Sequence, residues 1–153
     1  MVIRQTGALR RTVRSRYWLV LALLSCSPAT AVEVIVNSDV AVQSITQNTL
    51  RAIFTMHMRQ WPNGKPIKVF VLPETNMVHA SFAKEVLHTF PYQLKRSWDV
   101  LVFSGSGQAP TVANSPGEML QKVSSTPGAI GYLPNDYLIE GIKNENIHLL
   151  EPR

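Results

Sequence analysis

The spacing of apolar residues between positions 33 and 150 predicts short strands that alternate with helices. Runs rich in β-branched and aromatic residues at 33–36, 67–72, 129–133 and 147–150 are typical of strands. The run at 129–133 contains Ala129 and Gly131, which predicts a buried strand with little room for large side chains. This order of elements predicts an α/β fold with a mixed or mostly parallel sheet flanked by helices.

Helix signals fill the stretches between these runs. Thr46 is a capping residue type, and Leu50, Ile53 and Phe54 follow it at helical spacing. The capping box from Ser115 to Glu118 predicts a helix over 116–125. Other helices are predicted to begin at Thr75 or Asn76, with Val78, Phe82 and Val86 as the stripe, and near Pro91. The sequence shows no internal repeat or linker, so residues 32–153 are predicted to form one domain.

The first 31 residues have the pattern of a secretory signal peptide. A basic stretch precedes an apolar run at 17–24, and Ala29-Thr30-Ala31 has the form of a cleavage site. The apolar run is shorter than the ~20 residues that a membrane-spanning helix needs. Residues 23–26 also resemble a lipobox, so a lipoprotein anchored at Cys26 is the alternative. The sequence therefore predicts an exported, periplasmic protein.

The formal charge of +5 belongs to this N-terminal segment. Five of the 15 basic residues lie before position 17, and no acidic residue precedes Glu33, so residues 32–153 carry ten basic and ten acidic side chains. A neutral domain lacks the basic face that nucleic-acid binding needs, and no nucleic-acid partner is expected. Cys26 is the only cysteine, so cleavage after Ala31 would exclude disulfides and thiolate chemistry.

Two short sequence phrases, about sixty residues apart, resemble those of a known protein family. They are Ile53-Phe54 with the Trp61-Pro62-Asn63-Gly64 turn, and Thr126-Pro127-Gly128-Ala129-Ile130-Gly131-Tyr132; residues 82–87 and Trp98 with Phe103-Ser104-Gly105 lie between them. In order and spacing these phrases resemble the short phosphate ABC transporter substrate-binding-like proteins of the type 2 periplasmic binding protein superfamily. The resemblance implies a single lobe of that fold, without a catalytic role. It also implies phosphate or another small anion as ligand.

The family holds phosphate with a Ser-Gly-Ser-Thr type segment after the strand that corresponds to 67–72. Here that segment has no glycine and contains Glu74, whose carboxylate would repel an anion. The resemblance makes Thr75, Asn76 and Met77 the candidate ligand-binding residues, with simple helix capping as the alternative. Ser104, Gly105 and Ser106, with Gly107, form a second candidate anion loop, and an ordinary turn is the alternative.

Two weaker sites also follow from residue types. Met56, His57, Met58 and His79 form a Met/His set that suits copper(I), but they lack a strict ligand spacing, so no metal or other cofactor is expected. Trp61 lies in a turn, is expected to be partly exposed, and is the candidate partner contact. Trp98 and Tyr132 are expected to pack in the core or at its edge.

No recognised catalytic motif is present, so the sequence favours a binding protein over an enzyme. The leading hypothesis is an exported, non-catalytic module for phosphate or a related anion in transport. The alternative is a protein-interaction accessory of a membrane transporter or sensor, with no small-molecule ligand.

Overall fold

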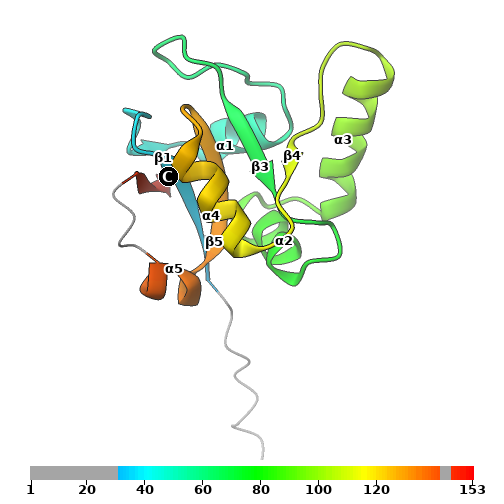
Figure 1. The fold of residues 1–153 in the computed structure, drawn as a ribbon. Helices are drawn as coiled ribbons and strands as arrows, with labels where there is room; N and C mark the ends of the chain where they lie inside the picture. The colour runs from blue at the N-terminus through cyan, green and yellow to red at the C-terminus, as the bar shows by residue number, and fades with distance from the viewer. Residues whose placement is uncertain (1–30, 142–145) are drawn as a thin grey trace, which may run out of the picture.

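The computed structural model describes residues 31–141 and 146–153, which form a single mixed sheet covered on both faces by helices (Figure 1). Residues 1–30 of the predicted signal peptide, which spans 1–31, lie outside the described residues. No helix in the described ranges is long and apolar enough to cross a membrane. The elements in chain order are β1 (Val32–Asn37), β2 (Ser44–Ile45), α1 (Gln47–Phe54), β3 (Lys68–Val71), α2 (Met77–Ser81), the π-helical turn η1 (Phe82–Val86), α3 (Pro91–Phe103), β4 (Thr111–Val112), α4 (Pro116–Ser125), β5 (Ala129–Pro134), α5 (Asn135–Gly141) and β6 (Ile147–Pro152).

The strand order in the sheet is β2-β6-β1-β5-β3-β4. Strands β4, β3 and β5 run parallel to one another, whereas β1 is antiparallel to both of its neighbours, β5 and β6. The predicted α/β class with a mixed sheet is therefore confirmed. The four predicted strands are present. In addition, the short strands β2 and β4 form the two edges of the sheet.

Successive residues of β5 face opposite layers of the molecule. Gly131 faces α4, because a Cβ atom at this position would meet the Sδ atom of Met119. Tyr132 faces the other layer, where its ring stacks on Phe82 at 3.8 Å between centroids and lies 5.9 Å from that of Phe54. Strand β5 is thus buried between α4 on one face and α1 with η1 on the other, as its small residues predicted.

The predicted helix signals are confirmed with two differences. Thr46, Asn76 and Ser115 cap α1, α2 and α4 with their side chains, and Pro91 begins α3. In the capping box, however, the carboxylate of Glu118 accepts from the backbone and side-chain amides of Asn114 rather than from Ser115. The helix after Asn76 is short and continues as a π-helical turn.

The predicted stripe on this helix is confirmed in part. Phe82 and Leu87 are fully buried, and Val78 and Val86 are partly buried and pack against the core. The structure also buries His79 and Ala83 completely, which the stripe did not include.

Candidate functional site

The parallel strands β3, β4 and β5 end at the same edge of the sheet, and a helix follows each of them. After β3 comes α2, after β4 comes α4, and after β5 comes α5. In open α/β sheets, ligands bind outside the carboxyl ends of the strands, where helix N-termini present free N–H groups. This edge, which we call the carboxyl edge, is the candidate functional site.

The loop between β3 and α2 offers two unused hydrogen-bond donors at this edge. Asn76 closes the loop, because its N–H donates to the carbonyl oxygen of Pro73 at 2.9 Å and its Oδ1 accepts from the N–H of Val78 at 2.8 Å. The N–H groups of Thr75 and Met77 have no acceptor among residues 31–141 and 146–153. Both residues are exposed. Free donors at the positive end of a helix dipole are suited to an anion.

A single buried hydroxyl fixes this loop at both ends. Tyr132 Oη accepts from the N–H of Leu72 at 2.9 Å, just before the loop. The same atom lies 2.6 Å from Nδ1 of His79, just after the loop. A hydroxyl can accept one hydrogen bond and donate another, so this one group bonds both Leu72 and His79. Nε2 is the one buried side-chain polar atom without a hydrogen-bond partner in the part of the chain that the structure describes.

Burial sets the protonation of this pair. It lowers the pKa of His79, an effect that the nearby Glu74 carboxylate partly opposes. Burial also raises the pKa of the Tyr132 hydroxyl, with the hydrogen bond from Leu72 opposing it. At neutral pH the pair is therefore uncharged, and His79 provides no positive charge to attract an anion.

Charged side chains near the loop nearly offset one another. Lys95 of α3 lies 3.6 Å from the carboxylate of Glu74 and 3.3 Å from that of Asp99. Lys95 thus weakens the repulsion that the sequence predicted for Glu74, although the three groups together still carry one negative charge. At the neighbouring helix start, Glu118 already occupies the N-terminus of α4 through its bonds to Asn114, which lower the pKa of its carboxyl group.

The second predicted anion loop lies elsewhere. Gly105 and Ser106 line a hollow together with Pro66 and Ile67, which precede β3, so the loop lies at the opposite end of that strand from Thr75–Met77. The N–H groups of Ser104, Gly105 and Ser106 all donate to carbonyl oxygens of the last turn of α3. Arg59 also donates to the carbonyl oxygen of Ser106 at 2.7 Å. The geometry is that of a helix C-terminal turn, and its role in anion binding stays a prediction.

The Met/His set is divided in the same way. Met56 lines that hollow before β3, whereas His79 is buried beside Tyr132 beyond the other end of the strand. His57 is exposed, and its Nδ1 lies 2.9 Å from Oγ1 of Thr55. Within the described ranges no three His, Cys, Asp or Glu side chains gather as metal ligands. Met58 is partly buried against the core, which is an ordinary packing role.

The expectation of an exposed Trp61 is wrong. Its side chain is 3% exposed, and its Nε1 donates to the carbonyl oxygen of Gly128 at 3.0 Å. The turn that contains it is present, with the N–H of Gly64 donating to the carbonyl oxygen of Trp61. Trp61 therefore joins the two halves of the sequence signature in the core and offers no surface to a partner. Trp98 and Tyr132 are buried, as predicted.

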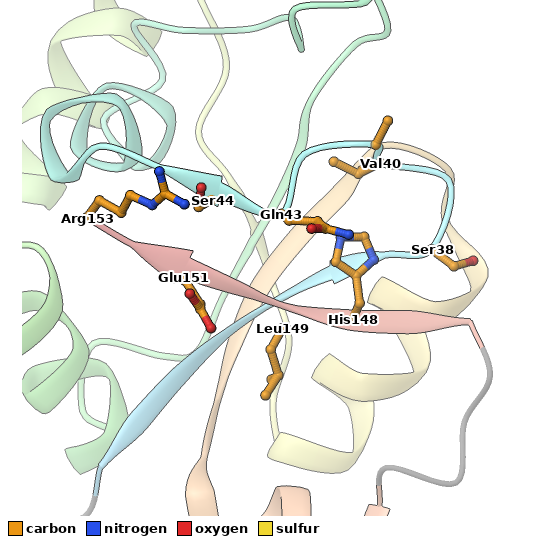
Figure 2. A pocket seen from close by; sticks show the side chains of 9 residues that line it. Ser38, Val40, Gln43, Ser44, His148, Leu149, Glu151 and Arg153 are labelled. Atoms are coloured by element: carbon orange, nitrogen blue, oxygen red, sulfur yellow. The ribbon is translucent and has the colours of Figure 1, made fainter.

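A separate hollow lies away from the carboxyl edge. It measures about 610 Å³ and lies between the loop after β1 and strand β6. Figure 2 shows His148 beside Gln43 on one side of β6, with Leu149 and Glu151 projecting from the other side. Nε2 of His148 lies 3.2 Å from the carbonyl oxygen of Val42. Glu151 thus points away from His148 and Gln43, and these three polar groups do not converge on one point.

The mixed sheet with its carboxyl edge has the fold of a single lobe of the periplasmic substrate-binding proteins, and solved structures share this fold. PstS from Borrelia burgdorferi superposes with a TM-score of 0.63 at 18% identity, covering 80% of this chain and 47% of PstS. A putative phosphate ABC transporter substrate-binding protein from Clostridium perfringens, solved with bound phosphate, superposes with a TM-score of 0.56 at 14% identity, covering 77% of this chain and 52% of that protein.

Sequence comparison finds a resemblance to the same kind of protein. The chain is 28% identical over 124 residues to the phosphate-binding protein PstS of Bacillus subtilis (strain 168), an alignment that covers 72% of this chain and 36% of PstS. The chain thus spans about a third of the length of this curated relative and about half that of the solved structures. No family model matches the chain. The resemblance to phosphate transporter substrate-binding proteins, first carried by the two phrases, is confirmed.

Proposed function

We propose that this protein is a non-catalytic, exported module that binds phosphate or a related small oxyanion at the N-terminus of α2. The observation that carries the proposal is the pair of free N–H groups of Thr75 and Met77 at the carboxyl edge. A relative named as phosphate-binding and a solved neighbour with bound phosphate support it. The exposed hydroxyl of Thr75 supplies a third donor beside the two N–H groups.

The charges at the carboxyl edge predict weak binding. The carboxylate of Glu74 lies next to the proposed donors, and Lys95 offsets only part of its charge because Asp99 shares the same ammonium group. His79 is uncharged at neutral pH and does not compensate. The proposed site therefore depends on the backbone N–H groups and the hydroxyl of Thr75. We therefore expect binding of phosphate only at millimolar concentrations. We also expect oxyanions to bind more tightly than chloride.

Thermal unfolding tests the proposal directly. We expect millimolar phosphate to raise the Tm by mass action, and sodium chloride at matched ionic strength to leave it unchanged. A Tm that responds equally to phosphate and chloride would show general salt stabilisation and refute specific binding. Sulfate separates an oxyanion site in general from one that prefers phosphate.

Two variants locate the site by isothermal titration calorimetry with inorganic phosphate. Thr75→Ala removes one donor and should weaken binding by about 1 kcal/mol or more, roughly fivefold in Kd. Glu74→Gln removes the repelling carboxylate and should tighten binding. Glu85→Gln, which changes the same charge at an exposed position on η1, is the matched control. Phosphate binding that neither Thr75→Ala nor Glu74→Gln alters would place the ligand elsewhere.

Export is a separate part of the proposal. Cleavage after Ala31 leaves Val32, the first residue of β1, at the start of the domain. We expect the protein recovered from the periplasm of a bacterial host to begin at Val32, as determined by intact mass. A lipid-modified Cys26 at the N-terminus would establish the lipoprotein alternative, and an unprocessed chain retained in the cytoplasm would refute export.

A protein-interaction role remains the second candidate. The specific observation in its favour is a row of exposed apolar side chains on α3. Exposed apolar patches on a soluble domain mark surfaces that contact another molecule.

A further inference from the structure

Helix α3 has two apolar faces, and only one of them is covered. Leu94 and Trp98 point into the core, and Trp98 also donates from Nε1 to the carbonyl oxygen of Phe54. On the same helix, however, Tyr92 is 64% exposed, Val100 59% and Phe103 88%. A surface helix normally shows polar residues on its outer face, so a second apolar face requires a separate explanation.

Tyr92, Val100 and Phe103 form a narrow stripe, whereas Val102, which is 48% exposed, lies outside it. At about 100° per residue, Tyr92, Arg96, Val100 and Phe103 fall within roughly 80° of one another around the helix. A hollow of about 480 Å³ runs beside them, lined also by His57 and Ser97. Arg96 makes no ion pair with the residues that the structure describes. The stripe is thus apolar at both ends and basic near its middle.

The stripe is also complementary to itself. Asp99 lies beside it on the helix surface, and the point midway between Arg96 and Asp99 along the helix is also midway between Tyr92 and Phe103. If a second helix of the same sequence lay antiparallel across this point, Arg96 would face Asp99 of that copy, and Tyr92 would face its Phe103. This is the isologous pattern of a two-fold interface, in which residue i contacts residue j and residue j contacts residue i.

We propose that the occupant of this face is a second copy of this chain, bound through antiparallel pairing of α3. The two aromatic contacts and the hollow beside Val100 provide the apolar burial. The two Arg96–Asp99 pairs set the register and direction of the helices, because exposed charge pairs contribute more to specificity than to affinity. The ion pair of Asp99 with Lys95 is compatible with this role, since a carboxylate accepts from several donors.

The pairing should be weak. A thirteen-residue helix contributes a contact about 20 Å long, and one helix pair buries less than the ~1,200–2,000 Å² of a stable interface. We expect a dissociation constant of roughly 10⁻⁵ to 10⁻³ M. The dimer would therefore form only where the protein is concentrated, and the phosphate site at the carboxyl edge is not needed for it.

Sedimentation velocity of the full chain, as purified from a bacterial host, over about 10 to 1,000 µM tests the pairing. The wild type should shift from monomer to dimer across this range. Phe103→Ser should raise the dissociation constant at least about tenfold without lowering the Tm, because this side chain is almost fully exposed in one copy. A monomer at every concentration would overturn the proposal.

A charge exchange gives the sharper test. Arg96→Asp alone should weaken the dimer at least about tenfold, because it sets two carboxylates opposite each other. Adding Asp99→Arg to Arg96→Asp should restore the affinity. Lys84→Glu reverses a charge at an exposed position on η1, outside the stripe, and should leave the dissociation constant of the dimer unchanged. Self-association that is insensitive to Arg96→Asp, or that the double exchange fails to restore, would show that another surface is responsible.

Discussion

The hydroxyl of Tyr132 is the atom whose removal tests the architecture of the carboxyl edge most directly. Tyr132→Phe keeps the aromatic ring, and with it the stacking on Phe82 and the contact with Phe54. It removes only Oη, which bonds Leu72 and His79. The substitution therefore isolates two buried hydrogen bonds from the packing that surrounds them.

The expected loss of stability follows from the groups left behind. The N–H of Leu72 and Nδ1 of His79 would both be buried without a partner, and each such group costs about 1–3 kcal/mol. Allowing for relaxation, we expect a loss of about 2–4 kcal/mol, which for a domain of this size lowers the Tm by roughly 6–20 °C. Urea unfolding should show a lower midpoint with an unchanged slope.

The matched control is Tyr92→Phe, which removes the same atom from an exposed ring and should change stability by less than about 0.5 kcal/mol. The double variant with His79→Leu should lose less than the sum of the two single variants, because the two side chains share one hydrogen bond. A Tyr132→Phe protein within about 0.5 kcal/mol of wild type would refute the role of the hydroxyl in fixing the loop.

Two further predictions concern other buried positions. Because burial lowers the pKa of His79 in the folded state, the unfolded state takes up a proton first as the pH falls, so the contribution of His79 to stability should be full above pH 6.5 and decline below it. His79→Leu should flatten this decline in urea unfolding at a series of pH values, and an unchanged decline would contradict the role of His79. Gly128→Ala should cost at least about 2 kcal/mol, because Gly128 has φ +74° and an added Cβ would clash with the carbonyl oxygen of Pro66. The comparison is Gly64→Ala, where φ is +82° but space is open, so the loss should stay near 1 kcal/mol; equal losses at the two positions would contradict the clash.

The sequence predicted the main helices and strands of this fold better than the two short strands at the edges of its sheet. Strong local signals such as the Ser115 cap, Pro91 and the β-branched run before Pro73 produced helices and strands close to the expected bounds. Strands β2 and β4 have two residues each, which is too short for a pattern of alternation to appear. The predicted stripe at 78–86 is confirmed at Phe82 but missed His79 and Ala83, which are fully buried beside it.

The site was only partly predictable. The capping role of Asn76 and the position of Thr75 at a helix start follow from local chemistry. The bond between His79 and Tyr132 joins residues 53 positions apart, and no local pattern reports such a contact. One signal was available, because His79, Ala83 and Leu87 recur at intervals of four, which places a histidine on the apolar side of its helix. Lys95, which offsets Glu74, also comes from a different helix.

The attachment of Leu72 and His79 to one core side chain has a consequence for how the loop between them meets a ligand. A loop that is free in solution loses conformational entropy when a ligand orders it, and this loss reduces affinity. Here both ends of the segment are held by an atom that belongs to the rigid interior, so its shape is set before any ligand arrives. Recognition at this edge is therefore preorganised, and the amide hydrogen of Leu72 should exchange with solvent only when β5 itself opens.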